Sequence, residues 1–444
     1  MEEQARPRIM ELLIPHKEAL VLILLLVESW NLADCYDPLD PNGNITVTFD
    51  IFQWTQEGYM ARVTIQNYYQ YRHVEIPGWS LGWTWAEQEV IESMAGALAT
   101  QQGDCSRYKY RTLHCCKRDP VIIDLTPDAA PENRTANCCH SGILSAWAID
   151  QSTSFSSFIM VVGGLDPKAA PQKPQNLTFL APGSGYTCGP FEVHTPTVFS
   201  VVEGRREEQA FKTWKSACTY SSFVANNAPA CCVSLSTFYN PKITPCSVCS
   251  CGCQASGNER PTCVGDSEMK RLPGDDNSVG CSDHMCPVRV HWHVKSNYID
   301  YWKVKVTVSN YNFASKFSNW NLVIQHPAFG QRTLSHSFNS TGLATVGNMD
   351  EAAIFWGLEY YNKELLQAGD KEPGSVMTEM VMHKDPESFT LRNGWAFPRR
   401  VYFNAEICEM PMPDDFPRLP NTSSRPSNAC YLIFILSFLI LLFH

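Results

Sequence analysis

Two short stretches of alternating apolar and polar residues decide the fold: ITVTFDI at residues 45–51 and VRVHWHV at residues 288–294. Alternation with a period of two is typical of a β-strand with one buried face. The two stretches begin 243 residues apart, and this spacing also aligns Tyr59 with Trp302, Val63 with Val306, Ile65 with Val308, Asn67 with Asn310, and Tyr68 with Tyr311. Trp79 and Trp320 correspond at nearly the same spacing. We predict an all-β fold with two related β-sandwich domains joined by a disulfide-rich segment, although any two amphipathic hairpins share such alternation.

Most of the remaining chain also has strand patterns, at residues 155–162, 197–202, 210–219 and 400–403. Helical patterns are scarce, and we expect helices only within residues 87–99 and 350–366. Pro- and Gly-rich stretches mark loops and linkers. We predict seven parts: a signal peptide (1–35), an N-terminal β-sandwich (36–165), a linker with additional strands (166–230), a Cys-rich segment (231–286), a C-terminal β-sandwich (287–411), a polar stalk (412–429) and a hydrophobic tail (430–444).

The charge balance and the cysteine content limit the class of protein. The 444 residues include 45 acidic and 35 basic side chains, which gives a net charge of −10. No block of Lys and Arg is dense enough to follow a phosphate backbone, so we expect no nucleic-acid partner. The 19 cysteines are many for a cytosolic protein and would pair in an oxidising compartment.

The N-terminal residues have the pattern of a secretory signal. Basic residues precede the apolar run ALVLILLLV at residues 19–27, which is too short to span a bilayer. We predict cleavage after Ser29 or after Cys35. An uncleaved membrane anchor is the alternative.

The C-terminal residues have the pattern of a lipid-anchor signal. The run CYLIFILSFLILLF at residues 430–443 is strongly apolar, and a polar stretch with Pro and Ser precedes it. Small residues, a polar spacer and a short apolar tail together direct attachment of glycosylphosphatidylinositol (GPI). The candidate attachment residues are Asn421, Ser423 and Ser424. We therefore expect the protein on the outer face of the plasma membrane, with a short tail anchor as the alternative.

The cysteines include three vicinal pairs and a dense cluster that begins with a C-x-x-C motif at residues 246–249. Adjacent cysteines rarely bond to each other, because a trans peptide holds their Cα atoms too close together. A zinc site is the alternative for the C-x-x-C cluster. We favour disulfides on compartment grounds, without a prediction of their pairing, for these residues: Cys105, Cys115, Cys116, Cys138, Cys139, Cys188, Cys218, Cys231, Cys232, Cys246, Cys249, Cys251, Cys253, Cys263, Cys281, Cys286 and Cys408.

Four N-x-S/T sequons are predicted N-glycosylation sites in a secreted chain: Asn44, Asn133, Asn176 and Asn339. A fifth sequon, at Asn421, lies in the presumed lipid-attachment region, and we leave it out.

Aromatic residues are dense in the first predicted sandwich. Flat rings can stack on the C–H faces of sugars, so an exposed row of rings would suit an extended polysaccharide. The candidates are Trp54, Tyr68, Tyr71, Trp79, Trp83 and Trp85. Any single ring is more often part of a sandwich core. His291 and His293 share one strand face, where a solvated polar face is favoured over a metal pair.

No fingerprint of a hydrolase, a zinc protease, a nucleotide-binding loop or a dinucleotide site is present in the sequence. We therefore expect no catalytic residues, no cofactor and no metal site. The alternatives are a secreted glycan-modifying enzyme and an adhesion or receptor-like surface protein with a protein partner.

The sequence resembles the COBRA family of plant extracellular proteins. The resemblance is carried by YDPLDPNGNIT at 36–46, YRH at 71–73, PGW at 77–79, LGWTW at 81–85, QGDC at 102–105, HCCK at 114–117, YTCGP at 186–190, CCVSLSTFY at 231–239, CSCGC at 249–253, HMCP at 284–287, VHWHVK at 290–295 and GWAFPRR at 394–400. It implies a GPI-anchored plasma-membrane and cell-wall protein with a role in cellulose microfibril deposition or orientation. It also implies that the first sandwich is a carbohydrate-binding module that contacts cellulose or another wall glucan.

Overall fold

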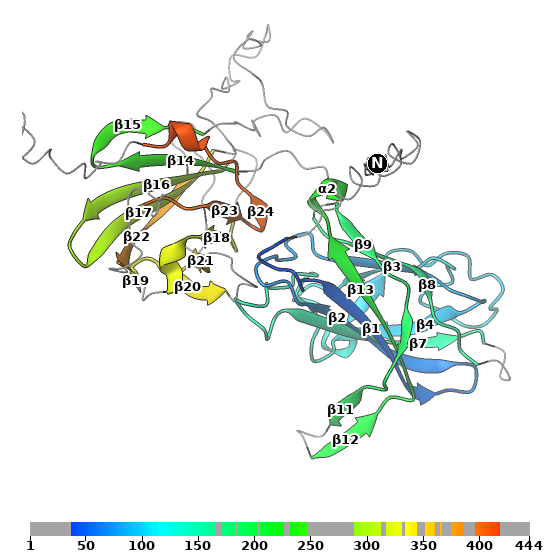
Figure 1. The fold of residues 1–444 in the computed structure, drawn as a ribbon. Coiled ribbons are helices and arrows are strands. Elements are labelled where there is room, and N and C mark those ends of the chain that lie inside the picture. Colours follow the sequence, from blue (N-terminus) through cyan, green and yellow to red (C-terminus); the bar gives the residue numbers. More distant parts are fainter. Residues whose placement is uncertain are drawn as a thin grey trace, which may run out of the picture. The chain divides into compact units, whose positions relative to one another are not determined.

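The computed structural model describes residues 37–165, 170–182, 184–201, 205–225, 231–246, 288–311, 317–330, 334–343, 351–359, 365, 374–384 and 396–417. Nearly all regular structure in these residues is β-strand, which confirms the predicted fold class (Figure 1). Contacts divide the chain into two compact units. Unit 1 comprises Met1–Tyr68, Ile76–Ile143 and Phe155–Asn226, and unit 2 comprises Tyr69–Glu75, Leu144–Ser154 and Asn227–His444.

Unit 1 contains two packed sheets. The larger sheet has the order β10-β13-β1-β2-β7-β4, with β9 also paired to β13. Its strands are β10 (Glu192–His194), β13 (Lys212–Tyr220), β1 (Ile45–Trp54), β2 (Tyr59–Asn67), β7 (Phe155–Gly163), β4 (Val90–Ala95) and β9 (Tyr186–Cys188). The smaller sheet has the order β5 (Ala97–Ala99), β6 (Val121–Asp124), β3 (Ser80–Thr84) and β8 (Gln175–Leu180). A separate hairpin is formed by β11 (Val198–Val201) and β12 (Arg206–Gln209), and the short helices are η2 (Pro131–Asn133) and α2 (Ser222–Ala225).

Unit 2 is also built from two sheets around one apolar core. The first has the order β15 (Asn240–Thr244), β14 (Cys231–Thr237), β16 (Val288–Asn297), β17 (Tyr301–Asn310), β22 (Gly374–His383) and β19 (Leu334–Ser335). The second has the order β20 (Phe338–Leu343), β21 (Ala352–Gly357), β18 (Asn321–Gln325), β23 (Arg400–Phe403) and β24 (Glu406–Ile407). Two short 3-10 turns, η4 (Pro327–Gly330) and η6 (Pro413–Asp415), complete the described elements.

The predicted repeat is present as two hairpins with the same pairing register. In unit 1, β1 and β2 pair with Ile45 opposite Asn67, and in unit 2, β16 and β17 pair with Val288 opposite Asn310. Each first strand has a β-bulge, between Ile51 and Gln53 in β1 and between Val294 and Ser296 in β16. The spacing of 243 residues that aligns the sequences therefore also aligns the strand register and the bulge.

The unit boundaries differ from the predicted domain boundaries in two ways. The strands placed in a linker at 166–230 belong to unit 1, because β13 pairs with β1 along seven residues. The loop Tyr69–Glu75 belongs to unit 2, where Arg72 forms an ion pair with Glu406 (2.8 Å). Asn321 also donates its side-chain N–H to the carbonyl of Tyr71 (2.9 Å). Strand pairing and buried polar contacts, which composition does not reveal, set these boundaries.

The helix predicted at residues 87–99 is wrong, and the helix predicted within residues 350–366 is not found in the described residues of that range, 351–359 and 365. Residues 87–99 form strands β4 and β5, and residues 350–366 contain strand β21. Gly96 separates β4 from β5 with a positive φ of 88°, a conformation that glycine adopts without steric cost. In β21, Ala352 to Phe355 are consecutively buried, so the run of apolar residues reflects a central strand between β20 and β18.

Five disulfides are present among the described residues: Cys105–Cys116, Cys138–Cys139, Cys188–Cys218, Cys231–Cys408 and Cys232–Cys246. This outcome supports disulfides for most of the predicted cysteines. Cys115 is an exception, because its thiol is free and buried in unit 1. The predicted disulfide residues Cys249, Cys251, Cys253, Cys263, Cys281 and Cys286 lie outside the described residues.

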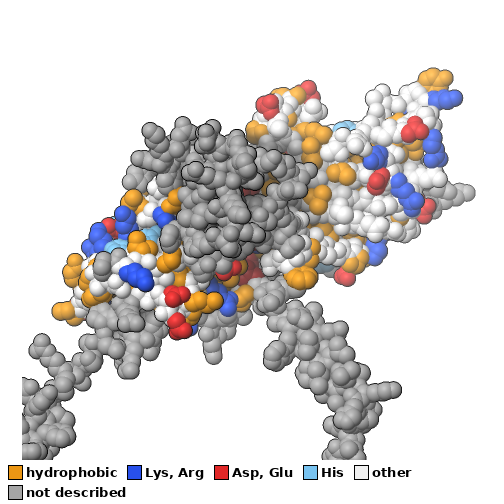
Figure 2. Space-filling view, turned by 90° about the horizontal axis from the view of Figure 1, so that it is seen from above, with side chains coloured by type: hydrophobic (Ala, Val, Ile, Leu, Met, Phe, Trp, Pro, Cys, Tyr) orange, Lys and Arg blue, Asp and Glu red, His pale blue; other side chains and the backbone are white. Residues whose placement is uncertain are grey.

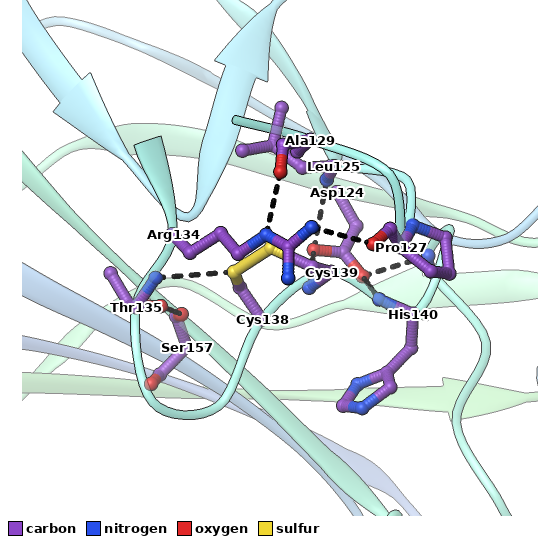
Figure 3. Close-up of a disulfide and its surroundings, with 11 residues drawn as sticks. Asp124, Leu125, Pro127, Ala129, Arg134, Thr135, Cys138, Cys139, His140 and Ser157 are labelled. Atoms are coloured by element: carbon purple, nitrogen blue, oxygen red, sulfur yellow. Dashed lines mark hydrogen bonds between the residues drawn. A yellow bond between two sulfur atoms is a disulfide. The ribbon is translucent and has the colours of Figure 1, made fainter. Parts of the chain in front are cut away.

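The expectation that adjacent cysteines bond elsewhere is wrong for Cys138 and Cys139, which bond to each other (Figure 3). Cys139 has a positive φ of 76°, and the Asp124 carboxylate accepts hydrogen bonds from the backbone N–H groups of Cys139 (3.0 Å) and His140 (2.9 Å). The same carboxylate accepts a bond from Gly142 (2.9 Å). A tight turn organised by one buried carboxylate therefore brings the two neighbouring sulfur atoms together.

The predicted signal peptide, the lipid-attachment residues and the hydrophobic tail lie outside the described residues. Within the described part of the chain, no helix has both the length and the hydrophobicity that a bilayer span requires.

Candidate carbohydrate-binding site

Four of the six aromatic side chains predicted to contact sugar are buried. Trp79, Trp83 and Trp85 lie in the core of unit 1. The ring of Trp83 packs edge to face against Phe49 of β1 (5.2 Å between centroids) and against Trp85 (5.4 Å). These rings fill the space between the two sheets, so the prediction that they are exposed binders is wrong. They contribute apolar burial to the fold instead.

The prediction that Tyr71 contacts sugar is also wrong. It belongs to unit 2, where its side chain is buried and its ring lies 5.7 Å from that of Tyr402. Tyr68 is partly exposed and directly follows β2, with its N–H bonded to the carbonyl of Asn44 (2.9 Å). Nine residues of β2 separate it from the Trp54 end of the sheet, about 30 Å of extended chain. Tyr68 and Trp54 therefore do not form one site.

Trp54 lies at an exposed end of the larger sheet of unit 1, where β1 ends and where β2 and β13 begin. Its side chain is 48% exposed, and that of the neighbouring Phe211 is 60% exposed. The Trp54 and Phe211 rings are 5.9 Å apart and inclined by 35°. Phe211 is fixed beside β1 because its N–H donates to the carbonyl of Ile51 (2.7 Å). Trp54 also contacts the buried Tyr59 ring edge to face (6.5 Å).

A cationic side chain contacts two further rings, on the face of β2 opposite that of Tyr59. The guanidinium carbon of Arg62 lies 4.4 Å from the ring centre of Phe199 on β11 and 5.8 Å from that of Phe52 on β1. Cation–π contacts of this kind restrain both the cation and the rings. We call the exposed pair of rings, Trp54 and Phe211, the sheet-end cluster.

The larger sheet carries a buried carboxylate close to this cluster. Asp50 is buried and accepts a hydrogen bond from the Thr213 hydroxyl (2.5 Å) across the β1–β13 pair. Burial raises the pKa of Asp50, and hydrogen bonds from Thr213 and Thr197 together with the charge of Arg62 oppose that shift. This carboxylate therefore ties β13 and the loop before β11 to β1, which positions Phe211 and Phe199.

The sheet-end cluster offers a planar apolar surface. Its two exposed rings can cover the C–H faces of sugar rings. Trp54 was predicted from the sequence, and Phe211 was missed. Phe211 carried a usable signal, because it is an aromatic residue near the start of the strand predicted at residues 210–219, just after the polar run at residues 205–209.

Comparison with known proteins bears on both units. The COBRA N-terminal domain profile matches residues 59–221, and the COBRA family C-terminal domain profile matches residues 230–275 and 258–417. This chain belongs to the COBRA family. It is 49% identical to COBRA-like protein 1 of Oryza sativa subsp. japonica over 413 residues, 91% of this chain and 92% of that protein. It is 46% identical to COBRA-like protein 2 of Arabidopsis thaliana over 428 residues, 94% of this chain and 96% of that protein. It is 44% identical to Protein COBRA of Arabidopsis thaliana over 436 residues, 95% of each chain.

The COBRA profiles correspond to the two sandwich units, and the motifs that carry the resemblance are largely structural. LGWTW supplies strand β3 and its buried tryptophans, and CCVSLSTFY supplies strand β14 with two disulfide cysteines. The sheet-end cluster lies outside the quoted motifs. The COBRA resemblance therefore identifies the fold, and the exposed rings must be found from the structure.

The predicted N-glycosylation sites are all at least partly accessible. Asn133 and Asn176 are exposed, and Asn44 and Asn339 are half-buried. Their glycosylation stays a prediction.

Proposed function

We propose that this COBRA-family protein is a non-catalytic cell-surface protein that takes part in cellulose microfibril deposition or orientation in the plant cell wall. Unit 1 binds glucan chains through the sheet-end cluster. Two lines of support converge: membership of the COBRA family along nearly the whole chain, and the exposed Trp54–Phe211 pair.

The exposed ring pair is the observation that carries the proposal. Burial of apolar surface stabilises a protein or complex by about 25 cal/mol per Å², and exposed apolar side chains do not gain this stabilisation. Large apolar side chains that lie beside one another on a surface therefore usually mark an interaction site. Trp54 and Phe211 are held by the β1–β2 turn and by the start of β13, so their orientation is largely set before a ligand arrives. A preformed flat surface lowers the entropic cost of binding a stiff glucan chain.

Attachment to the membrane is a second part of the proposal, and it rests on the sequence. Secretion through residues 1–35 and GPI attachment near Asn421, Ser423 or Ser424 would place both sandwiches outside the cell. Treatment of intact cells with a phosphatidylinositol-specific phospholipase should release the protein. A protein that stays with the membrane after this treatment would contradict a GPI anchor.

The binding proposal is tested with the full chain, purified in mild detergent and mixed with microcrystalline cellulose. We expect Trp54→Ala and Phe211→Ala each to reduce retention about tenfold, since each removes one stacking surface. Tyr110→Ala is the matched control, because Tyr110 is fully exposed elsewhere in unit 1. Thermal melting followed by circular dichroism should be unchanged in all three variants.

Equal retention of the wild type and both cluster variants would exclude these rings from the glucan contact. Equal loss in the Tyr110→Ala control would indicate non-specific adsorption. Either result would overturn the proposed site.

A further inference from the structure

Unit 2 has a second surface that the proposed function does not use. In β16 and β17, alternate residues point away from the core. The inward residues are buried valines and tryptophans, whereas the outward residues are Arg289, His291, His293, Lys295, Tyr301, Lys303 and Lys305. We call this the outer face of unit 2. The two adjacent strands pair from Val288–Asn310 to Asn297–Trp302, so these side chains share one side of one sheet.

The outer face is basic in a protein that is acidic overall. It carries four Lys and Arg side chains, and the outward carboxylate among the described residues of this sheet region is Glu379 of β22, opposite Lys305. Lys295 forms an ion pair with Glu379, and this hydrogen bond together with the charges of Lys303 and Lys305 lowers the pKa of Glu379. The whole chain has a net charge of −10, so the charge of this face is opposite in sign to that of the chain. Figure 2 shows Lys, Arg and His side chains on the left-hand part of the molecule, among hydrophobic side chains and some Asp and Glu.

A row of neutral hydrogen-bonding groups runs beside the basic side chains. His291 Nδ1 lies 2.7 Å from the Ser234 hydroxyl, and His291 Nε2 lies 2.8 Å from the Ser236 hydroxyl. The same Ser236 hydroxyl lies 2.7 Å from His293 Nδ1. Burial, with the charge of Arg289 next, lowers the pKa of His291 to about 4. The histidines are therefore neutral at the pH where the lysines are charged, and the face combines fixed cations with uncharged donors and acceptors.

Aromatic rings border one end of this face. Tyr298 and Tyr301, at the β16–β17 turn, are stacked with centroids 4.6 Å apart, and Tyr298 is 48% exposed. Phe238 and Tyr239, after β14, have centroids 3.8 Å apart and are also exposed. Asn297 donates its side-chain N–H to the Tyr239 hydroxyl (3.2 Å), which links the two pairs.

We propose that the outer face of unit 2 binds an anionic polysaccharide built from carboxylated sugars. Lys303, Lys305 and Arg289 would pair with successive carboxylates, the Ser–His row would bond to hydroxyls, and the tyrosine pair would stack on a sugar ring. This ligand differs from the neutral glucan of the proposed function and contacts the other unit. The inference therefore does not depend on the sheet-end cluster.

Two other classes of polyanion, anionic lipids and nucleic acids, are less suitable ligands because of where they occur in the cell. Anionic lipids are concentrated in the cytoplasmic leaflet, and nucleic acid is intracellular. Unit 2 contains the disulfides Cys231–Cys408 and Cys232–Cys246, which are typical of proteins that fold in an oxidising compartment. Carboxylated sugars are the polyanions that such a compartment presents as extended chains with alternating charged and hydroxyl groups.

The test measures binding of the full chain, purified in mild detergent, to sodium polygalacturonate at low ionic strength. Lys303→Glu combined with Lys305→Glu should weaken binding at least tenfold, and Lys303→Gln combined with Lys305→Gln should weaken it less. The matched control is Lys109→Glu combined with Arg205→Glu, which changes the net charge equally at exposed positions of unit 1. Binding should fall as salt rises, because salt screens pairs of this kind.

Three outcomes would overturn the inference. The first is equal affinity of the wild type and both outer-face variants. The second is equal loss of binding in the unit 1 control. The third is undiminished binding to fully methyl-esterified polygalacturonate, in which the carboxylates are neutral, or tighter binding to phosphatidylserine vesicles. Cellulose retention should be unchanged in the outer-face variants, so failure here is distinguishable from failure of the glucan proposal.

Discussion

In the repeated hairpins of the two sandwiches, the inward-facing residues are apolar in both units, whereas the outward-facing residues differ in their chemistry. Val47 and Phe49 of β1 correspond in the repeat to Val290 and Trp292 of β16, and all four are fully buried. The next outward position is Asp50 in unit 1, where a threonine hydroxyl bonds to it. In unit 2 the corresponding residue is His293, bonded to a serine hydroxyl. Core packing restricts one face to apolar residues of fitting volume, whereas the other face is free to acquire a different chemistry.

The strands that flank the repeated hairpins also differ. In unit 1 the neighbour of β1 is β13, which runs antiparallel to it. In unit 2 the neighbour of β16 is β14, which runs parallel to it. Because β13 starts and β14 ends at the turn end of its hairpin, Phe211 lies beside Trp54 in unit 1, and Phe238 follows β14 in unit 2. Different connections have thus placed aromatic rings at the same end of both hairpins.

The largest expected effect tests whether the two cores are equivalent. Trp79→Ala and Trp320→Ala each remove a fully buried indole from corresponding positions, so each should lower the free energy of unfolding of its own unit by about 3–5 kcal/mol. Urea denaturation followed by tryptophan fluorescence, with hydrogen exchange to assign the unit, measures this loss. Trp54→Ala is the control and should cost no more than about 0.5 kcal/mol. A loss below about 1 kcal/mol for either core variant would show that the burial is not equivalent.

A smaller effect tests the polar positions that distinguish the units. Thr213→Val keeps the side-chain shape but removes the hydroxyl that donates to buried Asp50, which should cost about 1–3 kcal/mol. Ser236→Ala removes the hydroxyl shared by His291 and His293, which are only half-buried, and should cost about 0.5–1.5 kcal/mol. Both values come from the same denaturation measurement. If Ser236→Ala cost more than Thr213→Val, the Ser–His row would be the more important of the two contacts for stability.

A pH dependence of stability is also expected in unit 2. The pKa of His291 is about 4 in the folded protein, below the ordinary value of 6.5. As the pH falls, His291 therefore takes up a proton in the unfolded chain at a higher pH than in the folded protein. The free energy of unfolding is unaffected by His291 above about pH 6.5 and declines between pH 6.5 and pH 4. Burial also lowers the pKa of His73 to about 4, so His73 adds to the decline in stability over the same pH range.

Thermal melting at pH 7.0, 5.5 and 4.5 checks this dependence. The melting temperature should fall by several degrees over this range, and His291→Gln should make the fall shallower. An unchanged slope in that variant would show that His291 is not held neutral by the fold.

The sequence predicted the elements that depend on periodicity. Alternation and a constant spacing were enough to identify both hairpins, because strand register follows the buried face. They were not enough to separate a buried ring from an exposed one. Trp83 lies on β3, between β6 and β8, and packs against Phe49 of β1, and Trp85 directly follows β3. Trp54, in contrast, lies where the sheet ends. That distinction depends on long-range packing between strands distant in the chain.

Two further features depended on contacts that local pattern cannot show. The Cys138–Cys139 bond requires the turn that Asp124 organises from 14 residues upstream, counted to Cys138. Phe211 becomes part of a site only because β13 pairs with β1, about 160 residues earlier in the chain. In both cases the sequence shows the residue and its chemistry, but it does not show which distant residues lie beside it in the fold.

Hydrogen exchange of the full chain with and without cellohexaose tests the central claim most directly. With cellohexaose we expect slower exchange at the β1–β2 turn and at the start of β13, and no change along β16 and β17. Polygalacturonate should instead slow exchange along β16 and β17. Protection by cellohexaose confined to unit 2, or no protection around Trp54 and Phe211 at saturating sugar, would contradict the central claim.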